Sequence, residues 1–249
     1  EIIYMDDDHG SMLKQYQFAI ENSDEGKEYL KKIEVLKNLV AEGNLGEASQ
    51  WEAPHMVAIS VDRHLFYPLF GFNSEDEKKL VPLKLTPLGL GAESEIQFVR
   101  DLESFYGSSL GQAAIGKRSL YLLRNAASAE KGLGFALAGN FYPDFLLWLV
   151  DDISGKQWLT FVDPKGLRQV DLSHPKLGLY KEVKTLESEL NKNFQSSLVL
   201  NAFILSNTKY SDLLNIGDKV KKDDLETRHV LFMEDGAASY LSKLFDVLV

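Results

Sequence analysis

Two short apolar runs, separated by a polar turn, constrain the fold of this chain most. Residues 140–150 (NFYPDFLLWLV) and 157–166 (QWLTFVDPKG) each have the length and aromatic content of a β-strand. The turn between them, residues 151–156 (DDISGK), is built of Asp, Ser, Gly and Lys with one Ile. This pattern predicts an antiparallel β-hairpin.

The hairpin would gather charged side chains at one of its ends. Asp144 lies near the start of the first strand and Asp163 near the end of the second, so antiparallel pairing makes the two carboxylates neighbours. Lys165 is two residues beyond Asp163 and therefore points to the same face. Adjacent carboxylates repel each other, which raises one pKa unless a cation neutralises them.

This group of side chains predicts a magnesium site, which Mn²⁺ also fits. Mg²⁺ prefers carboxylate, carbonyl and water oxygens, so Asp144, Asp163 and the carbonyl of Pro164 are its expected ligands. Lys165 can hold a phosphate or an attacking hydroxide. The pattern therefore favours metal-dependent hydrolysis of a phosphodiester.

The same residues resemble a known motif. Pro143-Asp144 with Asp163-Pro164-Lys165 resembles the PD-(D/E)xK motif of restriction-endonuclease-like nucleases. Residues 139–145 (GNFYPDF) and 161–167 (FVDPKGL) are more narrowly similar to the nuclease domain of type III restriction subunits and of helicase-fused defence nucleases. Residues 63–69 (RHLFYPL) and 93–102 (ESEIQFVRDL) resemble upstream segments of that family, so the likeness covers roughly residues 60 to 210.

The resemblance implies an α/β fold of the restriction-endonuclease-like type, a mixed β-sheet flanked by helices. It also implies a Mg²⁺-dependent endonuclease of antiviral defence that cuts DNA and leaves 5′-phosphates. The expected partners are DNA, a helicase or ATPase motor in the same or a partner polypeptide, and a methyltransferase subunit.

A fourth catalytic candidate, Glu95, follows from the resemblance alone, since the family has a metal-assisting glutamate on its first helix. Glu93 is the neighbouring candidate. The other interpretation of Glu95 is local, because the helix dipole favours an acidic residue in the first turn of a helix. Both interpretations are open at this point.

Two further motifs compete with the proposed site and are weaker. A second D-x-K triplet, Asp76-Glu77-Lys78, lies in a charged loop with no strand before it. Residues 111–117 (GQAAIGK) fit the first part of a phosphate-binding P-loop, but Arg118 stands where a Ser or Thr must follow. We therefore expect no ATP site in this chain.

A different class of function is also compatible with the motif. A catalytically silent module could keep the nuclease fold only for docking DNA or another subunit. The intact pair of aspartates and Lys165 argue against this alternative, because a scaffold has no need for carboxylates that repel each other.

Composition limits the remaining possibilities. With 249 residues, 45% of them hydrophobic, the chain can bury one substantial core and a smaller appended module. It has no cysteine, which excludes disulfides and thiolate metal sites. No apolar run reaches the length of a membrane span and no signal peptide opens the chain, so a cytoplasmic protein without a membrane partner is expected.

The net charge of −10 argues against a general nucleic-acid binder, but the positive charges are clustered. One cluster lies between residues 111 and 131, and a second follows the motif. The second cluster consists of Lys165, Arg168, Lys176, Lys181 and Lys184.

The order of expected elements divides the chain in two. Residues 1–90 are predicted to form a mainly helical N-terminal extension and linker. Residues 1–12 resemble an added or excerpted segment, so no fold is predicted for them. Residues 91–249 are predicted to form the nuclease domain. Within it, periodicity predicts helices over 93–106, 178–193 and 236–249 and strands over 119–125, 197–205 and 229–233, besides the hairpin.

Overall fold

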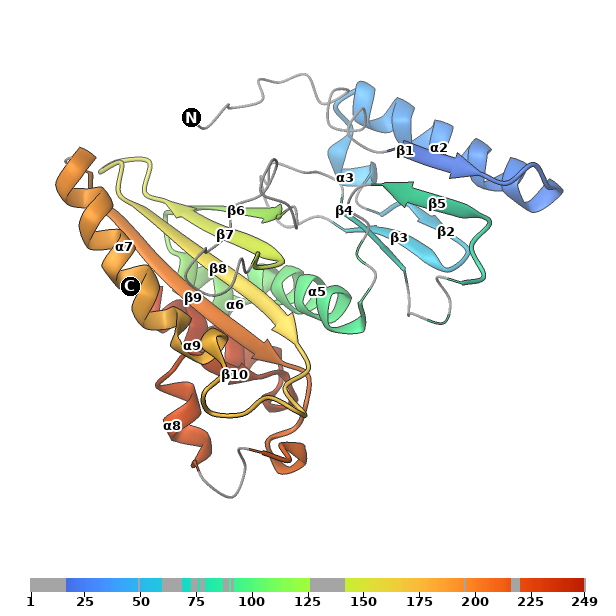
Figure 1. Cartoon of the computed structure of the whole chain (residues 1–249). Helices are drawn as coiled ribbons and strands as arrows, with labels where there is room; N and C mark the ends of the chain where they lie inside the picture. Colours follow the sequence, from blue (N-terminus) through green and yellow to red (C-terminus); the bar gives the residue numbers. More distant parts are fainter. Residues whose placement is uncertain are drawn as a thin grey trace. The chain divides into compact units, whose positions relative to one another are not determined.

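A computed structural model of the chain describes residues 17–48, 50–59, 69–72, 76, 79–86, 90, 92–125, 142–194, 196–215 and 220–248. The chain forms two compact units (Figure 1). The first comprises residues 1–60 and 64–100, and the second comprises residues 61–63 and 101–249. The division falls within helix α5 (Glu93–Gly107).

In its described residues, the first unit contains two small antiparallel sheets and the helices α2 (Asp24–Ala41) and α3 (Leu45–Ala48), besides the start of α5. Strand β1 (Gln17–Ile20) pairs with β5 (Leu83–Thr86), and β2 (Glu52–Ala53), β3 (Met56–Ile59) and β4 (Leu69–Phe72) form a three-stranded sheet. Helices α2 and α3 lie between β1 and β2 in the chain. The rings of Trp51 and Phe70 pack edge to face, with their centroids 5.9 Å apart. Trp51 Nε1 donates a hydrogen bond to the carbonyl of Lys32 at 2.8 Å.

The prediction of a mainly helical N-terminal extension was wrong, because the described part of residues 1–90 is a mixture of helices and strands. The strands are four residues long or shorter, which is too few for their alternation to stand out. The partners β1 and β5 are also far apart in the sequence, and a proline, Pro82, directly precedes β5. Tertiary pairing, not local pattern, forms this sheet.

The second unit is built on a five-stranded mixed sheet in the order β10-β9-β8-β7-β6. Strands β6 (Ser119–Arg124), β7 (Phe145–Val150) and β8 (Gln157–Lys165) form an antiparallel meander. Strands β9 (Leu198–Ser206) and β10 (Val230–Phe232) continue the sheet in parallel with β8. Parallel neighbours need a long crossover, which helix α7 (Leu179–Phe194) supplies between β8 and β9 and α8 (Lys222–Glu226) between β9 and β10.

Helices flank both faces of this sheet (Figure 1). Helix α7 covers one face, and α6 (Ser109–Ile115) and α9 (Ala237–Leu248) lie on the other. The described part of this unit also contains the short 3₁₀ turns η1 (Pro175–Gly178), η2 (Tyr210–Asp212) and η3 (Met233–Asp235). The expected class, a mixed α/β sheet flanked by helices, is therefore confirmed.

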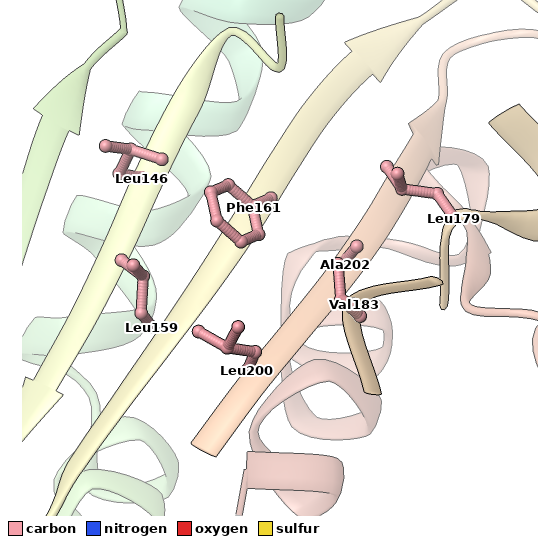
Figure 2. Packing of buried hydrophobic residues seen from close by; sticks show 7 residues of the cluster. All are labelled: Leu146, Leu159, Phe161, Leu179, Val183, Leu200 and Ala202. Atoms are coloured by element: carbon pink, nitrogen blue, oxygen red, sulfur yellow. The ribbon is translucent and has the colours of Figure 1, made fainter. Parts of the chain in front are cut away.

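Alternating residues of the central strands make the core under α7 (Figure 2). Leu159 and Phe161 of β8 lie on one face of the sheet, where Leu179 and Val183 of α7 cover them. Leu146 of β7 and Leu200 and Ala202 of β9 complete the cluster. On the α9 side, Tyr240 donates a hydrogen bond to Asp101 at 2.8 Å.

The P-loop-like segment has a different structure from a phosphate-binding loop. Most of residues 111–117 belong to α6, whose N-cap is Ser108: its Oγ accepts a hydrogen bond from the Gly111 N–H at 3.0 Å. A helix therefore precedes strand β6, whereas a P-loop needs a strand before its helix. This agrees with the expectation that the segment is not an ATP site.

Candidate functional site

The predicted hairpin exists, and it brings the two aspartates together. Strands β7 and β8 pair antiparallel with Phe145 opposite Val162, so the next residues outward, Asp144 and Asp163, face each other. The alternation that turns Phe161 toward α7 turns Asp163 and Lys165 the same way. Three of the four predicted catalytic residues thus share one end and one face of the hairpin.

Asp163 is buried, with 2% of its surface exposed. Its Oδ2 accepts a hydrogen bond from Lys176 Nζ at 3.0 Å. Burial raises the pKa of Asp163 to about 6, and although Lys176 and Lys165 oppose that rise, the neighbouring Asp144 adds to it. A carboxylate of this kind favours a positively charged partner.

Lys176 supplies that partner from η1, the turn that leads into the crossover helix α7. Burial lowers its pKa, while Asp163 acts in the opposite direction. A hydrogen bond and the charge of Lys165 lower it further, so the two ammonium groups lie close to each other. Asp163, Lys165 and Lys176 therefore form one electrostatically coupled group.

Asp144 has its own cation, Arg124 at the end of β6. Arg124 Nη1 lies 3.1 Å from Asp144 Oδ1 and also donates to the Asp144 carbonyl at 3.1 Å. The adjacent Asn125 donates from its backbone to the Asp144 carbonyl at 2.8 Å and from Nδ2 to the Pro143 carbonyl at 2.8 Å. These bonds fix the Pro143-Asp144 entry into β7.

The donor atoms at this end of the hairpin suit a hard divalent cation. The two carboxylates are adjacent, and a cation between them would offset both their repulsion and the burial of Asp163. Pro164 is buried in β8 between Asp163 and Lys165 and could add its carbonyl. Among the residues that the structure describes, no group of three or more His, Cys, Asp or Glu residues could hold a metal ion. A metal ion at this position would be coordinated by two carboxylates, a carbonyl and water. It would compete with Arg124 and Lys176 for the two carboxylates.

Glu95 lies in the first unit, whereas the aspartate pair and Lys165 lie in the second. It occupies the first turn of α5, is 8% exposed, and its Oε2 accepts a hydrogen bond from the Ala92 N–H at 3.4 Å. This contact satisfies a backbone amide at the start of the helix, as the local interpretation expects. A catalytic role for Glu95 stays a hypothesis.

Sequence reasoning missed the two cations that pair with the aspartates. Arg124 and Lys176 were visible only as members of basic clusters, and no motif singled them out. The decoy residues Glu77 and Lys78, residues 1–12 and the family-like residues 63–68 and 139–141 lie outside the described residues.

Comparisons with family models, with curated proteins and with solved structures found no match to this chain. The likeness to restriction-endonuclease-like nucleases thus rests on the motif residues themselves. In the part of the chain that the structure describes, no helix combines the length and apolar character needed to cross a membrane.

Proposed function

We propose that the second unit hydrolyses phosphodiester bonds of DNA in a Mg²⁺-dependent reaction. The observation that carries this proposal is Asp163, a buried carboxylate beside a second carboxylate and two lysines at the end of a hairpin. Burying an ionisable group is costly, and such clusters concentrate at functional sites. Their chemical types match the PD-(D/E)xK pattern position by position: Asp144, Asp163 and Lys165.

Each residue has a distinct role in this proposal. Asp144, Asp163 and the carbonyl of Pro164 would hold the cation, which when bound supplies positive charge to the phosphate and helps to activate a water. Lys165 orients that water, helps to deprotonate it and stabilises negative charge developing on the phosphate oxygens. The product carries a 5′-phosphate.

We further propose that the sheet belongs to the restriction-endonuclease-like type. The supporting features are the β6-β7-β8 meander, the crossover helix α7 and the parallel strand β9, with the motif residues at the ends of β7 and β8. On this proposal the protein is a cytoplasmic defence nuclease. A helicase or ATPase motor, in the same or a partner polypeptide, would move the DNA to the site. A methyltransferase subunit would recognise the DNA sequence.

One observation favours a second candidate, a silent module that docks DNA or a subunit. Both carboxylates are already neutralised, Asp144 by Arg124 and Asp163 by Lys176. A scaffold could keep such pairs without any metal. The two candidates differ in whether Mg²⁺ displaces the cations and starts cleavage.

A cleavage assay distinguishes them. Supercoiled, linear and single-stranded DNA, and RNA as a fourth substrate, are incubated with the protein with and without Mg²⁺. We expect Mg²⁺-dependent cuts in DNA that Asp163→Asn abolishes and that Glu189→Gln, an exposed change on α7, leaves intact. Cleavage that persists in Asp163→Asn, or no cleavage of any substrate by the wild-type protein, would reject the nuclease proposal.

A further inference from the structure

A small pocket opens beside the aspartate pair, between the end of β8 and the turn η1. Its volume of about 70 Å³ is several times the ~15 Å³ that one water needs. Lys165, His174 and Lys176 line it together with apolar side chains that include Leu167, Leu177 and Ile204. None of the described residues that line it is acidic.

The polar side chains that line the pocket can donate hydrogen bonds. The pocket is lined by two lysines, and a lysine ammonium can donate hydrogen bonds but cannot accept them. His174 Nδ1 accepts a hydrogen bond from the Lys176 N–H at 3.2 Å, so the proton of the neutral ring belongs on Nε2, which makes that nitrogen a donor too. Three side chains that can donate, and no acidic side chain among the described residues, line this small, mostly apolar pocket, which favours an anion over a cation.

The charges of the two lysines also favour an anion in this pocket. Lys165 lies close enough to Lys176 to lower the pKa of Lys176, and Asp163 is the carboxylate that acts in the opposite direction. An anion with several oxygens could accept hydrogen bonds from both ammonium groups at once. Apolar walls exclude water and strengthen those bonds.

We propose that this pocket holds a phosphate group of the nucleic-acid strand, next to the phosphate that is cleaved; this rests on the proposed function. The pocket shares Lys165 and Lys176 with the aspartate pair, so a strand crossing the site brings its next phosphate there. Lys176 also binds Asp163, so a phosphate that engages Lys176 frees the carboxylate for the cation. Phosphate and Mg²⁺ should therefore each raise the affinity of the other, because such coupling is reciprocal.

The test measures inorganic phosphate binding by calorimetry, first without and then with Mg²⁺. Lys176→Ala should weaken phosphate binding about 10-fold to 100-fold, the effect of losing one charge-assisted hydrogen bond. Lys192→Ala, at an exposed position of α7 outside the basic cluster, should leave the phosphate affinity unchanged. Since Lys176→Ala removes the partner of a buried carboxylate, the exposed Lys165→Ala provides a second variant, with the same expected loss and the buried ion pair left in place.

The source of the phosphate is tested by competition. A ten-nucleotide single-stranded DNA, with and without a 5′-phosphate, should displace inorganic phosphate in both forms. No phosphate binding, equal binding in wild type and both lysine variants, or displacement only by the 5′-phosphorylated form would overturn the inference. Asp163→Asn separates the inference from the proposed function: the variant should bind Mg²⁺ more weakly and lose cleavage but keep phosphate binding. Phosphate binding and displacement by DNA without Mg²⁺-dependent cleavage in wild type would reject the nuclease proposal and leave the anion pocket standing.

Discussion

At the scale of single residues, the burial of Asp163 is the least expected feature of the second unit. A carboxylate with 2% exposure loses nearly all its hydration, and one lysine does not fully replace it. The consequence is a pKa raised to about 6, chiefly by burial. This loss of hydration lowers the stability of the fold, and it also favours the binding of a cation to the Asp163 carboxylate.

The raised pKa predicts a pH dependence of stability. The folded state holds the Asp163 proton more tightly than the unfolded state, whose carboxyl titrates near 3.8. Stability contributed by Asp163 therefore falls as the pH rises from about 4 to about 6 and stays constant above that window. Denaturant unfolding with a chelator present should show a larger free-energy difference, wild type minus Asp163→Asn, at pH 4.5 than at pH 7.5. An equal difference at both pH values would show that Asp163 has an ordinary pKa.

Lys165 should be separable from the carboxylates, because it is assigned to the reaction and not to the metal. Lys165→Ala should keep near-normal Mg²⁺ affinity and lose cleavage by about 10²-fold to 10⁴-fold, the range for one positioned acid–base or electrostatic group. Lys165→Arg should restore activity only in part, since a guanidinium has another shape and does not deprotonate.

The decoy triplet provides the control for this comparison. Lys78→Ala, in Asp76-Glu77-Lys78, should leave cleavage unchanged. If Lys78→Ala abolished cleavage and Lys165→Ala did not, the catalytic site would lie in the other part of the chain.

At the scale of elements, the helices and strands with a strong local sequence pattern were predicted correctly. Helix α7 carries a stripe of Leu179, Val183, Leu186 and Leu190, and β8 is a long apolar run, so both were predicted within one or two residues. The short strands β1 and β5 were missed because their pairing is not local. The pairing of the two aspartates could be predicted because a hairpin is a local structure. Their ion pairs with Arg124 and Lys176 could not be predicted, because those contacts are not local. These pairs depend on how β6 and η1 pack beside the hairpin.

The close contact between α5 and α6 predicts a sensitive position. A Cβ on Gly111 would lie 1.9 Å from the carbonyl oxygen of Phe105, so Gly111→Ala must displace backbone. We expect a loss of about 1–3 kcal/mol in unfolding free energy. Gly107→Ala is the matched control, since a Cβ there meets nothing within 4 Å and Ala favours a helix. Equal stability of the two variants, measured by denaturant unfolding, would contradict the packing described for Gly111.

At the scale of the whole molecule, the chain has a net charge of −10 but also a pocket that is lined by two lysines. Any affinity for DNA should therefore come from few contacts and depend on salt. If Lys165, Lys176 and Arg168 each contact a phosphate, DNA affinity should fall about 40-fold between 50 and 200 mM salt. Fluorescence anisotropy with a labelled duplex measures this slope, and binding insensitive to salt would show that phosphate contacts do not drive it.

The proposed site depends most directly on the binding of a divalent cation by Asp144 and Asp163. Titration calorimetry with Mg²⁺ should show binding to the wild-type protein, at least about 10-fold weaker binding to Asp144→Asn and to Asp163→Asn, and unchanged binding to Glu189→Gln, because each aspartate supplies a charged ligand. Equal Mg²⁺ affinity in the wild type and both aspartate variants would contradict the account, since the two carboxylates would then serve only their ion pairs with Arg124 and Lys176.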